Sequence, residues 1–154
     1  MKLFGHPVHP LLIHFPTALL PMDLALSILY WSTGNESFYQ AGSYCLWAGT
    51  ALGLLAMLTG LVDLIGIPRA DKKAIELALY HAFLNGLILL IFAVIAYKAW
   101  QVFPAPFFVA TTGVAVKGVL ILALFVGNYL GGRLIYTHHI GINLNRQTDG
   151  NPPT

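Results

Sequence analysis

Among the residue types of this 154-residue chain, histidine can perform the widest range of chemistry, and the chain contains six. They are His6, His9, His14, His81, His138 and His139. A neutral imidazole can bind a metal ion or a haem iron, and it can also take up a proton near neutral pH. The first three lie within GHPVHPLLIHFP at residues 5–16, where three prolines interrupt the chain. The elements that carry the histidines decide which of them can share one site.

The composition indicates a protein that crosses a lipid bilayer. Hydrophobic residues make up 57% of the chain and charged residues only 9%, whereas about 25% of an ordinary soluble domain is charged. Four apolar blocks are each long enough for a bilayer-spanning helix, which needs roughly 20 residues. They cover residues 11–31, 41–66, 75–100 and 107–131. We therefore expect an all-α integral membrane four-helix bundle with up-down-up-down order over residues 1–142, followed by a polar tail at 143–154.

The positive charges predict how the bundle is oriented in the membrane. The loop between the second and third blocks carries Arg69, Lys72 and Lys73, and short basic loops stay in the cytoplasm. With four spans both termini share that side, so we expect both termini and all six histidines at the cytoplasmic face. The net charge of only +2 comes without a basic stripe, which argues against a nucleic-acid partner.

His14 and His81 are the main candidates for a cofactor site. The first and third helices of such a bundle lie diagonally, and cofactors bind in the core between facing helices. At about 1.5 Å rise per residue, His14 lies roughly 4 Å and His81 roughly 9 Å below the cytoplasmic boundary. Two neutral imidazoles at similar depth can fill both axial positions of a b-type haem. The alternative is that each is a core histidine hydrogen-bonded to backbone or to a carboxylate.

A stripe of small residues on the second helix is an independent hint of a cofactor groove. Its members are Gly42, Gly49, Gly53, Ala56, Gly60 and Asp63. Around Gly53 and Gly60 this face could admit a flat macrocycle, or equally a neighbouring helix, because small residues promote close helix packing in lipid. Asp63 could orient an imidazole or anchor the helix end beside Arg69.

Polar residues on the third and fourth helices are expected to face the same interior. Asn85 lies one turn beyond His81 on one helix face, and Asn128 is expected to support the site from the fourth helix. Lys117 lies eleven residues before Asn128 and is therefore nearly eclipsed with it. We expect Lys117 to pair with Asp23, because an unpaired charge in the bilayer costs about 2.5–3.5 kcal/mol.

The first helix presents a geometric difficulty. Nine residues separate His14 from Asp23, which places them on opposite faces of an ideal helix. Both can face the interior only if Pro16 and Pro21 distort the helix.

The remaining histidines are secondary candidates. His6 and His9 each precede a proline, which disfavours helix at these positions, so we expect an extended segment that folds over the site. His6, His9 and His138 could bind the haem propionates, or they could ligate a second metal centre.

Four motifs together resemble a known family. They are GHPVHPLLIHFPTAL, Gly60-x-x-Asp63, His81-x-x-x-Asn85 and GGRLIYTHHIGI at residues 131–142. In this order they resemble the bacterial Domain of Unknown Function 2231, a cytochrome b-like four-helix membrane domain. The resemblance selects His6, His9, His14, Asp63, His81, Asn85 and His138 as site residues. His139 stands where the family usually has glycine, which makes it a weaker candidate than His138.

The resemblance also bears on function. Members of such families occur fused to Rieske-type or cytochrome c domains, which implies electron transfer in the bacterial inner membrane. Our leading hypothesis is a multi-pass haem b protein that exchanges electrons with quinone or a redox partner. It would act as an electron carrier or oxidoreductase subunit, not as an enzyme by itself. The alternatives are a cofactor-free subunit of a larger complex, or of a homo-oligomer, and a proton or metal carrier.

Overall fold

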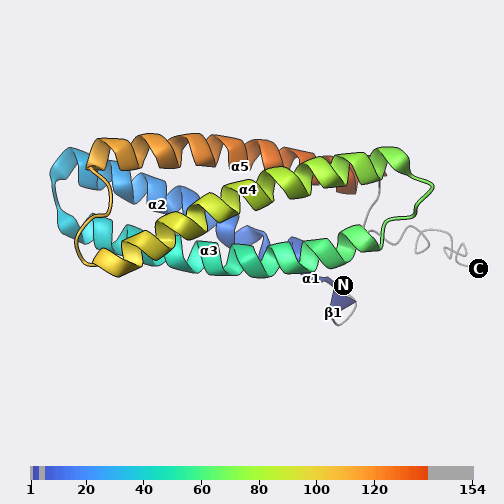
Figure 1. The fold of residues 1–154 in the computed structure, drawn as a ribbon, viewed down its shortest axis with the longest axis horizontal. Helices are drawn as coiled ribbons and strands as arrows, with labels where there is room; N and C mark the ends of the chain where they lie inside the picture. Colours follow the sequence, from blue (N-terminus) through green and yellow to red (C-terminus); the bar gives the residue numbers. More distant parts are fainter. Residues whose placement is uncertain (1, 4–5, 139–154) are drawn as a thin grey trace, which may run out of the picture.

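A computed structural model describes residues 2–3 and 6–138 of the chain, with side chains from residue 8 onward. Its elements are β1 (Lys2–Leu3), β2 (His6–Pro7), α1 (Val8–Leu12), α2 (His14–Thr33), α3 (Glu36–Ile65), α4 (Lys72–Val102) and α5 (Ala110–His138). The strands β1 and β2 pair antiparallel, with Leu3 opposite His6. The long helices α2 to α5 lie side by side, and consecutive helices run in opposite directions (Figure 1).

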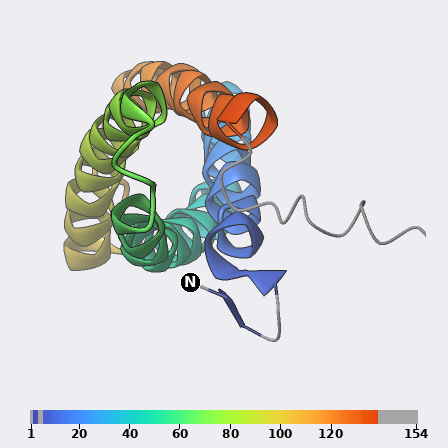
Figure 2. The same cartoon turned by 90° about the vertical axis from the view of Figure 1, so that its right-hand side faces the viewer.

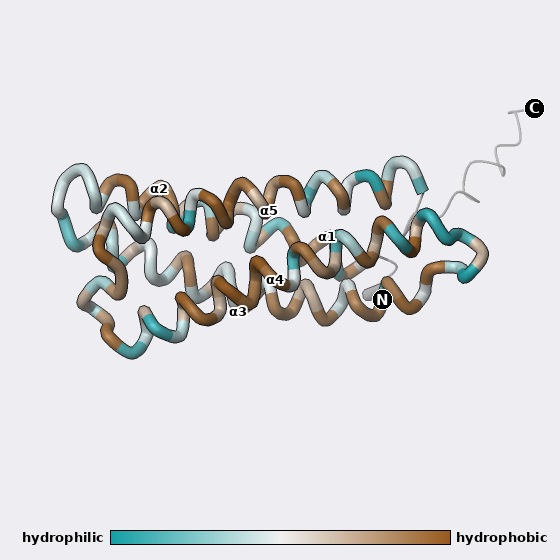
Figure 3. The backbone as a smooth tube through the Cα atoms, turned by 45° about the horizontal axis from the view of Figure 1, so that its top comes forward, coloured by the Kyte–Doolittle hydropathy of each residue, from teal (hydrophilic) through white to brown (hydrophobic). Residues whose placement is uncertain are grey.

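The expected all-α fold of four long helices is confirmed. The segments Val8–Thr33, Glu36–Ile65, Lys72–Val102 and Ala110–His138 are long and apolar enough to cross a membrane. Hydrophobic residues recur along the whole length of these helices (Figure 3). Two boundaries differ from expectation: a break at Ile13 divides the first span into α1 and α2, and the fourth helix continues to His138 instead of ending at 131. The expected tail at 143–154 lies outside the described residues.

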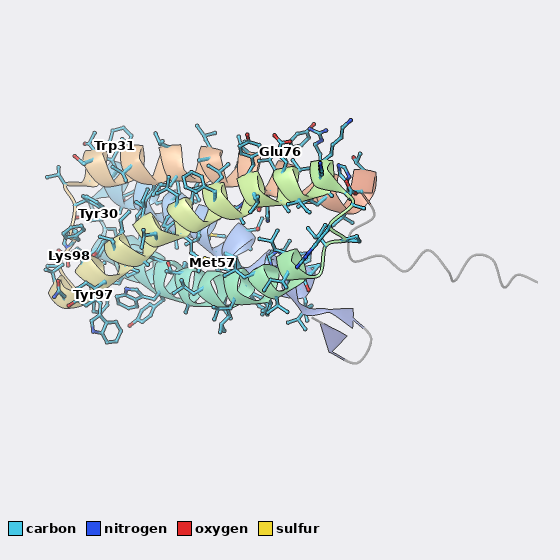
Figure 4. The ribbon with its side chains drawn as sticks, turned by 45° about the vertical axis from the view of Figure 1, so that its right-hand side comes forward. Tyr30, Trp31, Met57, Glu76, Tyr97 and Lys98 are labelled. Carbon is cyan, nitrogen blue, oxygen red and sulfur yellow. The ribbon has the colours of Figure 1, made fainter. Side chains whose placement is uncertain are left out.

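The four long helices form a closed ring. Contacts join α2 to α3, α3 to α4, α4 to α5 and α5 back to α2, and a view along the bundle shows this order (Figure 2). We call the end with α1 and the connection at 66–71 the histidine end. The other end, with the connections at 34–35 and 103–109, is the tryptophan end, where Tyr30, Trp31, Tyr97 and Lys98 lie (Figure 4).

The packed centre of the bundle is apolar and draws on all four long helices. Its most enclosed side chains are Phe92, Leu20 and Leu46, which are 0%, 1% and 2% exposed. Ile121 and Leu124 of α5 complete the cluster. Lipid is as apolar as these side chains, so close packing of side chains, more than escape from water, holds such helices together.

Prolines explain the break between α1 and α2. Pro16 has no N–H and cannot donate a helical hydrogen bond to Leu12. The neighbouring bonds persist: the Ile13 N–H donates to the His9 carbonyl at 3.1 Å, and the Thr17 N–H donates to the Ile13 carbonyl at 3.2 Å. The five residues of α1 bury none of their side chains. This short helix is therefore a separate element that carries His9.

A tight turn joins α2 to α3 at the tryptophan end. Gly34 ends α2 with a positive φ of 69°, a conformation that glycine adopts without steric cost. Asn35 then caps α3, because its side-chain oxygen accepts a hydrogen bond from the Ser37 N–H at 3.0 Å.

Loss of the Asn35 cap is expected to destabilise the bundle measurably. Asn35→Ala removes the acceptor for the Ser37 N–H, and such changes cost about 0.5–2 kcal/mol. The midpoint of unfolding in mixed detergent micelles measures the loss. Asn35→Asp keeps an acceptor and should stay close to wild type, so equal losses in both variants would show that the cap contributes nothing.

Candidate cofactor site

His81 of α4 is fixed by the backbone of α5. Its Nδ1 lies 2.9 Å from the Gly127 carbonyl oxygen. A carbonyl can only accept a hydrogen bond, so Nδ1 carries the proton and donates. In the neutral ring Nε2 then keeps a free lone pair, which is the form that binds a metal.

His9 of α1 is fixed in the same way by α3. Its Nδ1 lies 2.7 Å from the Ala56 carbonyl oxygen. This carbonyl also accepts the Thr59 hydroxyl at 2.9 Å. Nδ1 of His9 is therefore also the protonated nitrogen, and Nε2 is again free to act as a ligand.

A glycine one turn beyond each carbonyl makes room for the imidazole. A Cβ atom at Gly60 would lie 2.9 Å from Cε1 of His9, and a Cβ atom at Gly131 would lie 2.7 Å from Cε1 of His81. The same arrangement thus occurs twice: the Nδ1–H donates to a carbonyl, and the ring edge lies against the glycine four residues later. Only residues without a side chain permit such close approach.

The two imidazoles lie next to each other at the histidine end. Their ring centroids are 6.3 Å apart, and the ring planes meet at 82°. They come from opposite parts of the chain, one from the N-terminal α1 and the other from the third long helix. Among the described histidines, this is the pair that the fold brings together.

The structure places His14 apart from His81, its expected partner. His14 is exposed, and its Nδ1 lies 3.3 Å from the Leu11 carbonyl of the same segment. The buried face of α2 instead contains Pro16, Leu20, Asp23 and Ser27. Because α2 stays helical through Pro21, the half-turn offset between His14 and Asp23 persists. Asp23 faces inward, and His14 faces outward.

The glycines of α3 mostly receive neighbouring helices. A Cβ atom at Gly53 would meet Leu89 at 2.7 Å and Pro16 at 3.5 Å, and one at Gly49 would meet Leu20 at 3.0 Å. The groove expected around Gly53 is therefore filled by packing. Gly60 differs, because its neighbour is the His9 ring.

Two asparagines support the interior by different contacts. Asn85 lies beside His81, with its Nδ2 3.2 Å from Nδ1, and it donates to the His81 carbonyl at 2.8 Å. Because His81 Nδ1 carries a proton that it donates to Gly127, it cannot also accept a hydrogen bond from Asn85. The Asn85 side chain therefore donates to the His81 carbonyl oxygen. Asn128 donates to the Thr17 hydroxyl at 3.3 Å and joins α5 to α2. Thr17 was not identified from the sequence, because this residue belongs to no motif that indicates such a contact.

The other expected site residues lie at the histidine end or outside the described residues. His138 contacts Asp71 at 3.4 Å, which joins the end of α5 to the start of α4. The pKa of Asp71 is lowered, first because its carboxylate accepts the Ala74 N–H and also because His138 is close. Asp63 is half-buried one turn beyond Gly60. The side chain of His6 and the whole of His139 lie outside the described residues.

Asp23 and Lys117 form a buried ion pair far from the histidines. Lys117 Nζ donates to Asp23 Oδ1 at 2.6 Å and to Ser27 Oγ at 2.9 Å. The Ser27 hydroxyl itself donates to the Asp23 carbonyl at 2.8 Å. The sequence predicted the ion pair but missed Ser27, although its place one turn beyond Asp23 was the available signal.

Substitution of Gly131 is expected to disturb the His81 ring. Gly131→Ala places a methyl group 2.7 Å from Cε1 of His81, and overpacking of this kind costs about 1–3 kcal/mol. The unfolding midpoint in detergent should fall accordingly. The neighbouring Gly132→Ala is a matched control, because its Cβ atom would have nothing within 4 Å. Equal stability of the two variants would contradict the close contact.

These features define a class of protein: a bundle of four apolar helices that can cross a membrane and that holds two histidines side by side at one end. The chain belongs to the family described as "Predicted membrane protein (DUF2231)", which it matches over residues 5–144. No curated protein and no solved structure matches the chain.

Proposed function

We propose that the chain binds one b-type haem between His9 and His81 and that it transfers electrons within the membrane. The observation that carries the proposal is the pair of imidazoles, 6.3 Å apart, each with Nδ1 bonded to a backbone carbonyl. This is the arrangement that orients metal-ligating histidines in proteins, because it fixes the tautomer and leaves Nε2 available.

The spacing of the rings fits two axial ligands of one iron. With metal–nitrogen bonds of about 2 Å, two imidazoles on opposite sides of one metal have centroids roughly 6 Å apart. The observed 6.3 Å agrees with this value. With His9 and His81 as its ligands, a bound haem would supply one-electron transfer at this site.

The donor set favours haem over an isolated metal ion. Within the described part of the chain, no group of three or more His, Cys, Asp or Glu could hold a metal ion. Protein zinc sites use three or four such ligands. A haem brings four ring nitrogens of its own, so two histidines are enough.

The haem would lie at the histidine end, between Gly60 of α3 and Gly131 of α5. Leu89 and Pro16 occupy the surroundings of Gly53, so the macrocycle does not extend along α3 as far as that residue. His138 and the asparagines then support neighbouring backbone and helix ends and do not ligate iron.

The basic residues Arg69, Lys72 and Lys73 favour a cytoplasmic position for this end, and a membrane quinone or a redox protein would be the electron partner.

An optical spectrum of the protein, purified after expression with ample haem, tests the proposal. We expect a Soret band in the oxidised protein, split α and β bands after reduction with dithionite, and one haem per chain by pyridine haemochrome. Because the ring planes meet at 82°, the oxidised iron should give the strongly anisotropic low-spin electron paramagnetic resonance signal of perpendicular imidazoles. A colourless protein that does not take up added haemin would overturn the proposal.

A further inference from the structure

A small cavity lies beside the buried ion pair at the tryptophan end, away from the proposed haem. Its volume is about 30 Å³. The polar residues in its wall are Ser27, Tyr30, Tyr39, Ser43 and Lys117, and the connection between α4 and α5 contributes Phe107 and Phe108. A single water needs about 10–15 Å³ of such space, so the cavity has room for about two.

Unused hydrogen-bonding groups meet at this cavity. Lys117 uses two of its three ammonium N–H groups on Asp23 and Ser27, and in the described part of the chain the third has no acceptor. The Tyr39 hydroxyl is buried and has no partner among the described residues. Ser43 donates its hydroxyl to the Tyr39 carbonyl at 3.0 Å, so its oxygen can still accept.

The occupant must therefore both donate and accept hydrogen bonds. An apolar occupant would leave the Tyr39 hydroxyl and an ammonium N–H unsatisfied, which is costly in a buried site. An anion is disfavoured because Asp23 already neutralises the Lys117 ammonium. The oxygens of Ser27 and Ser43 can only accept hydrogen bonds, which an anion cannot donate. A metal cation would face the Lys117 ammonium without a carboxylate in the cavity wall. Water fits all of these groups.

The two carboxylate oxygens of Asp23 differ in their contacts. Its Oδ1 accepts from Lys117, whereas Oδ2 is buried and has no partner among the described residues. The other titratable groups around the pair are Tyr30 on α2 and Tyr39 and Cys45 on α3, and α4 contributes only Ile95 and Ala99 to the cavity wall. A proton donated by Lys117 would reach Oδ1, the oxygen that its ammonium contacts.

We infer that this cavity holds water, and that the water connects the Asp23–Lys117 pair to the aqueous phase at the tryptophan end as a proton-exchange site. Lys117 passes a proton along its hydrogen bond to Oδ1 of Asp23, and the amine so formed takes up a proton from the water, which Tyr39 resupplies from the aqueous side. Lys117 thus keeps its charge, and the net charge of the pair rises by one. The apolar cluster around Leu20, Phe92 and Leu124 separates the pair from the histidine end, so the exchange is one-sided.

Infrared spectroscopy of the protein in lipid nanodiscs tests this inference without reference to haem. As the pH is lowered, we expect a carboxylic-acid band that is absent in Asp23→Asn and that shifts within seconds of transfer to D₂O. Tyr39→Phe should slow this shift at least tenfold. Tyr44→Phe is the matched control, because Tyr44 lies on the same helix but is 60% exposed, and its rate should equal wild type.

Several outcomes would overturn the inference. They are a carboxyl band that does not exchange over hours, exchange in Tyr39→Phe at the wild-type rate, and a band that persists in Asp23→Asn. A structure at a resolution that shows water provides a second measurement. Water within hydrogen-bonding distance of both Tyr39 Oη and Lys117 Nζ supports the inference, and an empty or lipid-filled cavity refutes it.

Discussion

Lys117→Met is expected to destabilise the folded protein by about 3–5 kcal/mol, the cost typical of removing one partner from a buried ion pair. The reason is that the Asp23 carboxylate stays behind without its cation. The side chains of Lys117 and Asp23 are only 8% and 1% exposed, so the remaining carboxylate is poorly solvated. Unfolding by sodium dodecyl sulphate in mixed micelles, followed by circular dichroism, measures the difference.

Two controls separate the lost charge from the lost side chain. Lys98→Met makes the same substitution at an exposed lysine and should change stability by less than about 0.5 kcal/mol. The double variant Asp23→Asn, Lys117→Met removes both charges, and we expect it to recover most of the loss because no buried charge remains. If Lys117→Met and Lys98→Met are equally stable, the ion pair does not stabilise the fold.

His81→Ala and His9→Ala are each expected to weaken haem binding by more than about 100-fold, beyond the 10–100-fold typical of losing a residue that merely orients a ligand. Each removes one of the two imidazoles whose Nε2 is free to bind iron. Titration of the purified protein with haemin, followed at the Soret band, measures the affinity. Added imidazole should restore part of the low-spin spectrum, because it can enter the space that the side chain leaves.

His14→Ala is the decisive control for these variants. The sequence favours His14 as a ligand, whereas the structure places it on the exposed side of α2. We expect His14→Ala to keep the wild-type spectrum and affinity. Loss of haem in His14→Ala together with its retention in His9→Ala would reverse the assignment of the ligand.

Much of the fold can be predicted from the sequence because the bilayer imposes a simple rule. Each backbone group in the membrane must be satisfied within a helix, so a continuous apolar block of sufficient length indicates a spanning helix. The observed helices begin and end within a few residues of the expected blocks, except where α5 runs on to His138. The contact between His138 and Asp71 lies at the end of this extension, and hydropathy does not detect it.

The contacts of individual side chains could not be predicted from the sequence as well as the helices could. The stripe of glycines on α3 was compatible with a macrocycle or with a helix. Only the packed structure shows Leu89 against Gly53 and the His9 ring against Gly60. Whether a glycine face receives an aliphatic side chain or an imidazole depends on the position of the opposing helix along its axis, which residue spacing alone does not fix.

By itself, the sequence determined the four apolar helices, the gathering of the described histidines at one end, and Asp23 and Lys117 as the charges that must meet. Helical periodicity and the cost of a charge in lipid are local rules, and they follow from residue order. The tertiary structure decided that His9, and not His14, lies beside His81. That choice depends on the break at Ile13, which lets α1 leave the line of α2, on carbonyls 47 and 46 residues away along the chain, and on the glycines one turn beyond those carbonyls. Such contacts exist only after the helices have packed.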